Sequence, residues 1–252
     1  MGKIICVANQ KGGVGKSTTV LSIGQALIEK KKKVLFVDLD SQCNLTTLLS
    51  VPREGVGNSI DLLMNSKNIK DTIIHTEEGD VIPANQFLAN TDMMLGNVVG
   101  REYRLKNHLD QIKDDYDYII IDTPPALGTI TINALTSSDE VIIPSLPDML
   151  SSQGVAQIFQ TINEVKANTK NKDLKVSGIV LTRYNARTSV TKFVEESLDE
   201  LAKQYGTKVF KTKIRESVAV RESQAIRANM FSDYKKTNAV EDYRNLVKEI
   251  KF

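Results

Sequence analysis

A glycine- and lysine-rich segment near the start of the chain has the residue types and spacing of an anion-binding loop. Residues 11–18 read KGGVGKST and follow directly on the apolar run Ile4–Ala8. This order predicts a strand, a tight loop and the start of a helix. Successive backbone N–H groups and the positive end of the helix would then converge on one anion. Glycines at positions 12, 13 and 15 leave room for phosphate oxygens close to the main chain.

Two side chains extend this prediction from an anion to a nucleotide. Lys16 stands where a phosphate-loop lysine reaches the β- and γ-phosphates, and Ser17 stands where a hydroxyl ligates Mg²⁺. The usual loop has a glycine six residues before that lysine, whereas this chain has Gln10. A glycine-rich turn with unrelated lysines is the alternative interpretation. The loop residues predicted to bind a nucleotide are Lys11, Gly12, Gly13, Val14, Gly15, Lys16, Ser17 and Thr18.

Acidic residues follow two further apolar runs. Asp38 and Asp40 close the run 33–38, and Asp122 closes the run 118–122. Phosphoryl transfer needs a metal ion, a positioned water and positive charge on the developing oxygens. Asp122 follows a hydrophobic run as a Walker B acid does, so we predict that it holds Mg²⁺ through water. The alternative role, capping a helix, is disfavoured because prolines stand at 124 and 125.

The composition is that of an ordinary globular protein. The chain has 252 residues, of which 41% are hydrophobic and 25% charged, enough for one large α/β core. No apolar run approaches the roughly 20 residues of a membrane span, and no signal-peptide pattern precedes the first apolar run. We therefore expect a cytoplasmic protein. Cys6 and Cys43 are too few for a disulfide framework or a zinc site.

Apolar runs and helical patterns alternate along most of the chain, which predicts a single α/β domain over residues 1–252. Such alternation gives a mostly parallel sheet flanked by helices, with the ligand at the carboxyl ends of the strands. Residues 51–115 are the least informative part. The expected strands are 4–8, 33–38, 81–84, 118–122, 140–144, 176–181 and, more weakly, 207–210. The expected helices are 17–31, 151–168, 189–205 and 238–250.

Positive charge is concentrated late in the chain. Residues 203–236 carry nine lysines or arginines against three acids, although the net charge of the whole chain is only +2. A local basic patch on a nearly neutral protein indicates contact with a polyanion. A solvated face is the alternative. No aromatic residues are interleaved for base stacking, so the contact would be to phosphates and independent of sequence.

The loop K-G-G-x-G-K-S resembles the deviant Walker A loop of the ParA/MinD family of dimeric ATPases. The resemblance implies a P-loop NTPase fold, ATP and Mg²⁺ as ligands, and a homodimer in which Lys11 reaches the nucleotide of the other subunit. It also implies that Asp40 positions the attacking water and that Asp38 supports the metal shell. The family sequence after the second strand is D-P-Q-G-N, and this chain departs from it at Ser41 and Cys43.

Further motifs extend the resemblance over almost the whole chain. Residues 116–125 resemble the family's third motif, residues 181–188 a loop at the end of a strand, and residues 214–223 the wall of the adenine site. Ile214 and Arg215 are therefore expected at the nucleotide. In the ParA branch, basic residues at the positions of Arg187 and Arg215 bind DNA without sequence preference. The basic segment adds Lys211, Lys213 and Arg221 to this predicted DNA surface.

The expected function is that of a short Soj-like ParA partition ATPase. The first strand begins at Lys3, which leaves no room for an N-terminal helix-turn-helix domain. The resemblance implies non-specific double-stranded DNA and a ParB-like centromere-binding protein as partners, no membrane, and a place on the nucleoid. The alternative is a MinD-like or other cargo-positioning ATPase that acts on membrane or protein cargo. A small-molecule ligase and a bacterial tyrosine kinase are less consistent with Lys11 and with the few tyrosines near the end of the chain.

Overall fold

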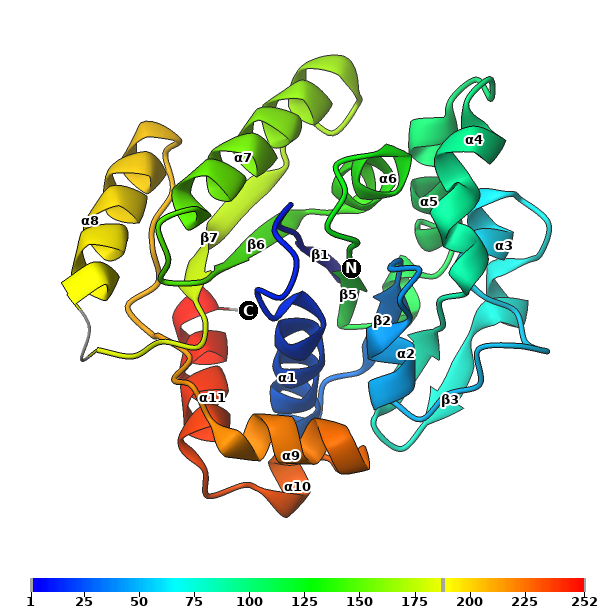
Figure 1. The fold of residues 1–252 in the computed structure, drawn as a ribbon. Coiled ribbons are helices and arrows are strands. Elements are labelled where there is room, and N and C mark those ends of the chain that lie inside the picture. The colour runs from blue at the N-terminus through cyan, green and yellow to red at the C-terminus, as the bar shows by residue number, and fades with distance from the viewer. Residues whose placement is uncertain (1, 187–188, 252) are drawn as a thin grey trace.

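Seven strands form one sheet at the centre of the molecule (Figure 1). The computed structural model describes residues 2–186 and 189–251. The strand order is β3-β4-β2-β5-β1-β6-β7, and every neighbouring pair is parallel except β3 and β4. The strands are β1 (Lys3–Val7), β2 (Val34–Asp38), β3 (Ile74–Thr76), β4 (Gly79–Ile82), β5 (Tyr118–Asp122), β6 (Glu140–Ser145) and β7 (Lys175–Leu181).

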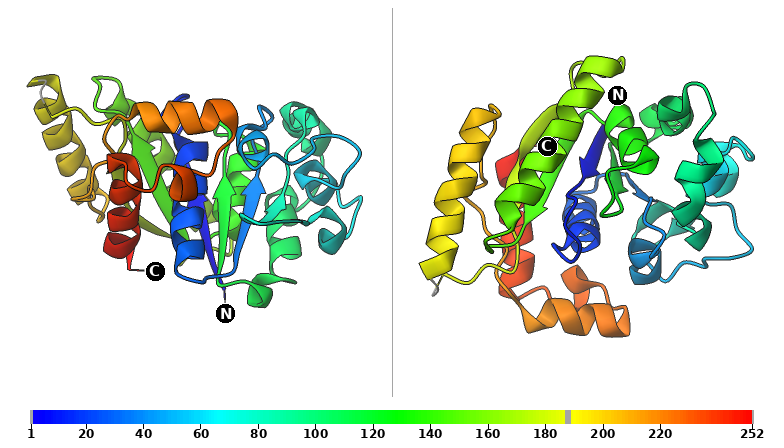
Figure 2. Two further views of the ribbon diagram at one scale, coloured as in Figure 1. Left: turned by 90° about the horizontal axis from the view of Figure 1, so that it is seen from below. Right: turned by 45° about the horizontal axis from the view of Figure 1, so that its top comes forward.

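Helices cover both faces of this sheet, so the predicted fold class is confirmed (Figures 1 and 2). The α-helices are α1 (Lys16–Glu29), α2 (Asn44–Leu48), α3 (Ser59–Leu63), α4 (Thr91–Leu95), α5 (Arg104–Leu109), α6 (Thr129–Ser137), α7 (Ser151–Asn168), α8 (Ser189–Gln204), α9 (Val218–Ile226), α10 (Met230–Asp233) and α11 (Asn238–Ile250). Four short 3₁₀ turns are η1 (Ile69–Thr72), η2 (Gln86–Asn90), η3 (Arg101–Tyr103) and η4 (Lys113–Asp115).

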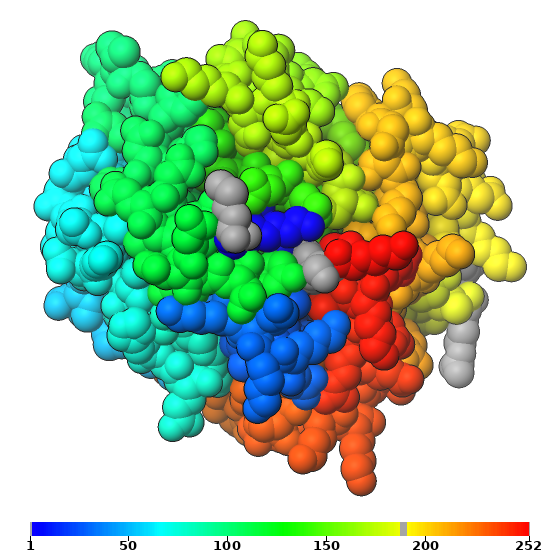
Figure 3. All heavy atoms as spheres, turned by 180° about the vertical axis from the view of Figure 1, so that it is seen from behind, coloured from blue at the N-terminus to red at the C-terminus, as the bar shows by residue number. Residues whose placement is uncertain are grey.

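Alternate residues of the central strand β1 enter two separate cores. Ile4 and Cys6 pack in the layer that contains α5, α6, α7 and α8. Ile5 and Val7 pack in the layer that contains α1, α10 and α11. Because both faces are covered, the central strands are apolar almost without interruption, as the sequence indicates. On the face seen in Figure 3, the first described residues lie beside the end of α11.

Several expected elements agree with the structure, and one does not. Helices α7 and α11 have the predicted bounds, and α1 and α8 differ from the predictions by one residue or two at their ends. The expected strand at 207–210 is wrong: this segment makes only an isolated bridge between Val209 and Ile179. It runs along the sheet edge beyond β7, too briefly paired to form a strand. The pattern did not predict β3 or the short helices between residues 51 and 115.

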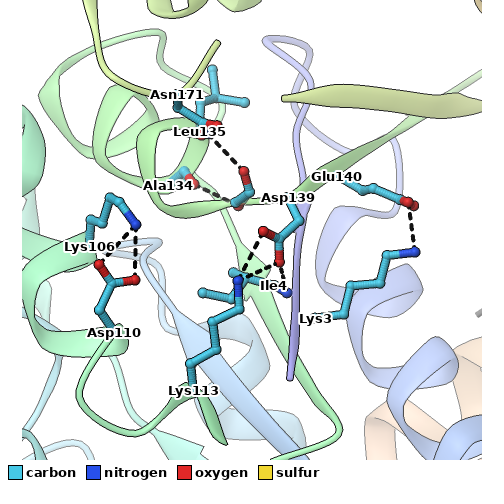
Figure 4. A network of polar contacts seen from close by, with 11 residues as sticks. Lys3, Ile4, Lys106, Asp110, Lys113, Ala134, Leu135, Asp139, Glu140 and Asn171 are labelled. Atoms are coloured by element: carbon cyan, nitrogen blue, oxygen red, sulfur yellow. Dashed lines mark hydrogen bonds and ion pairs between the residues drawn. The ribbon is translucent and has the colours of Figure 1, made fainter. Parts of the chain in front are cut away.

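Polar contacts fix the amino-terminal ends of the strands (Figure 4). Asp139 accepts a hydrogen bond of 2.7 Å from the backbone N–H of Ile4 and forms an ion pair of 2.9 Å with Lys113. Lys3 contacts Glu140 at 2.6 Å. These contacts hold β1 in register against β5 and β6 and therefore set the height at which β1 ends. The opposite, carboxyl ends of the same strands carry the predicted site.

Candidate active site

The loop between β1 and α1 has the backbone conformation that an anion cradle requires. Gly13 and Gly15 have φ of 73° and 86°, in the left-handed region that other residues adopt at a cost. Helix α1 begins at Lys16, directly after Gly15. The first backbone N–H groups of α1 therefore face the loop, where they and the helix dipole attract an anion.

The loop is tethered on both sides. The carbonyl oxygen of Val14, whose side chain is buried, accepts a 2.8 Å hydrogen bond from the hydroxyl of Thr182 at the end of β7. Asn9 donates to the carbonyl of Pro144 in β6 at 2.7 Å and accepts from the backbone N–H of Lys11 at 3.0 Å. These contacts fix the cradle before any ligand binds, so little ordering is left to binding.

Lys16 lies inside the curve of the loop. Its ammonium donates to the carbonyl oxygen of Lys11 at 3.3 Å, and the residue is buried. Burial lowers its pKa, although the carboxylates of Asp122 and Asp40 act against that shift. A positive charge held here without full solvation is placed to meet the oxygens of a phosphate chain.

Asp38 and Asp40 follow one another at the end of β2 but have different surroundings. Asp38 accepts hydrogen bonds from the backbone N–H of Asp40 at 3.0 Å and from the N–H and hydroxyl of Thr46 at 2.8 and 2.7 Å. Burial raises the pKa of Asp38 to about 6. Its oxygens are therefore engaged in holding the turn. Asp40 accepts from the N–H of Gln42 at 3.0 Å and borders the groove beside the loop.

Asp122, at the end of β5, is fully buried, and Ser17, Lys16 and Asp38 act on its carboxyl group. Burial, together with the carboxylate of Asp38, raises its pKa well above the usual range, while Ser17 and Lys16 act against the shift. A buried carboxyl group is costly unless hydrogen bonds or a cation compensate it. Ser17 and Asp122 supply hard oxygen donors of the kind that Mg²⁺ prefers, whereas both oxygens of Asp38 accept hydrogen bonds within the turn.

We expect the substitution Asp122→Asn to stabilise the nucleotide-free protein at pH 7. The raised pKa values of Asp38 and Asp122 mean that the folded state binds more protons than the unfolded chain above pH 4. The protonated forms of these two carboxyl groups therefore favour the folded state at low pH. Their contribution to the free energy of unfolding is lost as the pH rises through about 6, the pKa of Asp38. Removing the Asp122 charge should therefore raise the free energy of unfolding at pH 7.

Urea unfolding at pH 5 and pH 7 measures this effect, with the exposed Asp173→Asn as the matched control. An unchanged or lower free energy of unfolding for Asp122→Asn at pH 7 would contradict the electrostatic account of the buried acids. The same variant should bind Mg²⁺ and nucleotide less tightly, so stability and function change in opposite directions.

Lys11 does not lie over its own loop. Its ammonium forms a short ion pair with Asp148, just before α7, and Asp148 also accepts from the N–H of Leu150 and the hydroxyl of Ser151. Asp148 is thus fixed at the start of α7 and holds Lys11 to the side of the groove. Met149 and Leu150 follow it and are 62% and 68% exposed.

A second hollow continues from the phosphate loop toward the end of β7. This cavity of about 240 Å³ has the expected Ile214 and Arg215 in its wall. Val220 also lies in the wall, within the stretch 214–223 that the resemblance predicts there, whereas the sequence analysis missed Thr182 and Gln224. Gln224, on α9, donates a 2.8 Å hydrogen bond to the hydroxyl of Thr18 and so joins α9 to the phosphate loop. Only the short apolar and polar pattern of 218–226 could have indicated this helix.

The residues predicted to bind DNA lie near this hollow but differ in their charge partners. Lys213 pairs with Glu195 at 2.6 Å, and Arg215 pairs with Asp242 at 2.6 Å. Lys211 and Arg221 are exposed, and no ion pair involves them within the part of the chain that the structure describes. Arg187 lies outside the described residues. A groove beside the cavity is bordered by Lys213, Arg215 and Arg221.

Comparison with known proteins decides the family. A family model described as an AAA domain matches residues 2–176. The sporulation initiation inhibitor protein Soj of Bacillus subtilis is 39% identical over 253 residues, which cover 99% of this chain and 98% of Soj. The chain belongs to the ParA/MinD family. The chromosome partitioning protein ParA of Myxococcus xanthus is 34% identical to this ParA-like chain, with 99% of the chain and 88% of that protein covered.

Solved structures agree with this assignment. A plasmid partition protein of Borrelia burgdorferi bound to AMPPNP has a TM-score of 0.82 to the ParA-like chain at 28% identity, covering 99% of this chain and 98% of that one. A structure named cobyrinic acid a,c-diamide synthase, from Mycobacterium smegmatis, holds ADP and magnesium. Its TM-score is 0.84 at 36% identity, with 98% and 93% of the two chains covered. The ParA-like chain is thus a P-loop NTPase, and solved structures similar to it hold AMPPNP, or ADP with magnesium.

Proposed function

We propose that this protein is a Mg²⁺-dependent DNA-partition ATPase that dimerises on ATP, binds DNA without sequence preference and is released when a ParB-like partner stimulates hydrolysis. One observation carries the proposal. Lys16, Asp40 and Asp122 come from three separate segments and meet at the carboxyl edge of the sheet, around a preformed phosphate cradle. The names of the relatives supply the partition context.

The described residues fit the steps of ATP hydrolysis. The loop N–H groups and Lys16 would bind the phosphates, while Ser17 and Asp122 would hold Mg²⁺ with Asp38 bracing the turn. The metal supplies positive charge to the phosphate oxygens. Asp40 borders the groove and has one carboxylate oxygen that accepts from Gln42, which leaves the other to orient a water toward the terminal phosphate. Catalysis of this kind is mostly positioning and electrostatic stabilisation.

Dimerisation would complete the site. In the single chain Lys11 is held by Asp148 to the side of the groove. The exposed Met149 and Leu150 lie next to this pair, and Met93 is 80% exposed on α4. Helix α4 is joined to the start of α6, near the groove, by Asp92, which accepts from the N–H of Thr129 at 2.8 Å. A second copy that covered this rim would bury apolar surface and let Lys11 reach the phosphates opposite.

Light scattering with and without a non-hydrolysable ATP analogue and Mg²⁺ tests this proposal directly. We expect the 28.0 kDa chain to double in mass with the analogue and to stay monomeric with ADP. Lys11→Ala should bind the analogue but stay monomeric, whereas the exposed Lys30→Ala should dimerise normally. A monomer in every nucleotide state would contradict the proposal.

The proposed DNA surface combines paired and unpaired cations. Arg215 and Lys213 are neutralised in part by Asp242 and Glu195. Asp242 is buried, and it accepts hydrogen bonds from both the backbone and the guanidinium of Arg215. Arg221 and Lys211, which have no ion-pair partner among residues 2–186 and 189–251, would follow the phosphates. Two such surfaces in a dimer would act on one duplex, which raises affinity through effective concentration. A place on the nucleoid follows from this binding.

We expect Arg221→Ala and Lys211→Ala to weaken binding to random-sequence duplex DNA severalfold without lowering the unfolding temperature. Each should reduce the slope of log affinity against log salt by about 1, as for one lost phosphate contact. Arg215→Ala should lower the unfolding temperature as well, because it leaves the buried Asp242 uncompensated. The exposed Lys172→Ala, far from this surface, is the matched control. Equal effects of Lys172→Ala and Arg221→Ala would contradict the assignment.

Two alternative functions would use the same fold. A cargo-positioning ATPase that acts on membrane or protein would use the same nucleotide site. Within residues 2–186 and 189–251, no helix is long and apolar enough to cross a membrane.

The structure named as an amide synthase suggests ATP-dependent amide formation as a second alternative. Hydrolysis that needs an acid substrate, rather than DNA and a partner protein, would favour that second alternative.

A further inference from the structure

Arg183 has an unusual backbone conformation at the mouth of the 240 Å³ cavity. Its φ is 49°, in the left-handed region that non-glycine residues adopt only at a cost. Among the side chains in the wall of this cavity, no other belongs to a non-glycine residue with positive φ in the described part of the chain. Backbone strain of this kind persists only where the surroundings impose it, and it gathers at functional sites.

The neighbours of Arg183 impose this conformation. Thr182 donates two hydrogen bonds: its hydroxyl to the carbonyl of Val14 at 2.8 Å, and its N–H to the carbonyl of Ser145 at 2.9 Å. On the other side, the N–H of Tyr184 donates to the carbonyl of Ile214 at 2.9 Å. Arg183 therefore bridges two fixed points, one on the phosphate loop and one on the cavity wall. Its side chain is directed by the backbone rather than by a strong side-chain partner.

The Arg183 side chain is only weakly held. Its guanidinium lies 3.8 Å from the carboxylate of Glu216, at a site where both side chains are about half exposed. By comparison, Arg215 makes several hydrogen bonds of 2.6–3.2 Å to Asp242. An exposed pair at 3.8 Å contributes little to stability. The planar group of Arg183 is thus available to a ligand in the cavity.

The part of the cavity away from the phosphate loop has the features of a nucleobase site. Gly13, Gly15 and Thr18 border it on the phosphate side, whereas Ile214 and Val220 supply apolar surface on the far side. The aromatic residue in its wall, Tyr243, is buried, and its hydroxyl forms a hydrogen bond with the hydroxyl of Thr19. It therefore offers no open ring face. A base in this cavity would therefore need another flat group to stack on, and Arg183 lies at the mouth.

We propose that the guanidinium of Arg183 stacks on the nucleobase of the bound nucleotide, with Ile214 and Val220 on the apolar side of the base. This inference rests on the proposed function, since it assumes that ATP is the ligand. A guanidinium is flat, always charged and weakly hydrated, and it stacks on aromatic rings through cation–π attraction. The left-handed backbone at Arg183 is the structural feature that brings the group to this position.

Binding of two ligands to the intact chain tests the proposal: ATP and inorganic tripolyphosphate, each with Mg²⁺, by calorimetry. We expect Arg183→Ala to raise the Kd for ATP about fivefold to twentyfold, within the range of one cation–π contact, and to leave the Kd for tripolyphosphate unchanged. Arg183→Gly should weaken ATP binding equally while relaxing the backbone, so a loss through misfolding is separated from a loss of stacking. Arg183→Lys should restore little, because it keeps the charge but not the plane.

Arg227 provides the matched control, because it also has a left-handed φ, of 55°, but does not border the cavity. Arg227→Ala should bind ATP as the unsubstituted protein does. An equal loss for tripolyphosphate would overturn the proposal by assigning Arg183 to the phosphates. Unchanged ATP binding by Arg183→Ala would overturn it as well. Failure of the unsubstituted protein to bind ATP would instead contradict the proposed function itself.

Discussion

The substitution Asp40→Ala is expected to stop ATP hydrolysis and to leave a stable, DNA-bound dimer. Asp40 borders the groove beside the phosphate loop, and its neighbours Asp38 and Thr46 hold the turn without it. Nucleotide binding should therefore survive the change. Loss of a group that orients or activates water typically slows catalysis by about 10²–10⁴-fold. We expect the turnover rate to fall by at least about 100-fold.

A steady-state phosphate-release assay with DNA and partner protein measures this loss, and retention on immobilised duplex measures the trapped dimer. The exposed Asp173→Ala is the matched control and should hydrolyse ATP at the normal rate. Hydrolysis by Asp40→Ala at or above that rate would show that another group positions the water. Failure to bind ATP would show instead that Asp40 is needed for the local structure.

The substitution Lys16→Ala is expected to remove nucleotide binding rather than turnover alone. Lys16 is the buried cation inside the loop, and it should form charge-assisted hydrogen bonds to phosphate, each of about 1.5–3 kcal/mol. Two such bonds correspond to a loss of at least about 100-fold in affinity. Because burial lowers the pKa of Lys16, removing its charge should not lower the unfolding temperature of the nucleotide-free protein.

Lys11→Ala separates the two lysines. Lys11 is paired with Asp148 in the single chain, so its loss should leave ATP binding to the monomer within about twofold while dimerisation and turnover fail. Calorimetry with the non-hydrolysable analogue measures both variants, and the exposed Lys30→Ala serves as the control. If Lys11→Ala lost nucleotide binding as completely as Lys16→Ala, the two lysines would share one role and the account of the dimer would be wrong.

The phosphate loop and the acids could be placed from the sequence because their information is local. A strand followed by glycines and a lysine specifies its own geometry, and Gly13 and Gly15 adopt the expected left-handed conformation. Asp38 and Asp122 close parallel strands that pair directly, Asp38 opposite Asp122, so the topology alone brings them together. These predictions needed only the rule that parallel strands end at one edge of a sheet.

The remainder depends on contacts between distant residues. Nothing in residues 218–226 indicates that Gln224 reaches Thr18, which is 206 positions away. The partners of Lys213 and Arg215, namely Glu195 and Asp242, are likewise set by packing. A count of lysines and arginines treated all basic residues of the segment alike, whereas the structure separates paired from unpaired cations.

The departure from the family sequence at Cys43 also has a structural answer. Cys43 precedes α2 with φ of 54°, the left-handed conformation that glycine would supply at no cost. Its side chain is buried in the core layer of α3 and α6. Burial of the sulfur in this core contributes apolar packing that opposes the backbone cost.

Binding of the purified protein to random-sequence duplex DNA, with ATP and Mg²⁺, with ADP, and without nucleotide, shows whether this protein is an ATP-dependent DNA-binding dimer. Each state is measured at two salt concentrations, because phosphate contacts weaken steeply with salt. We expect tight, salt-sensitive binding in the ATP state alone, and its loss in Lys11→Ala, which should bind ATP but not dimerise. Equal binding in all three nucleotide states, or none in any of them while ATP is hydrolysed, would contradict this expectation.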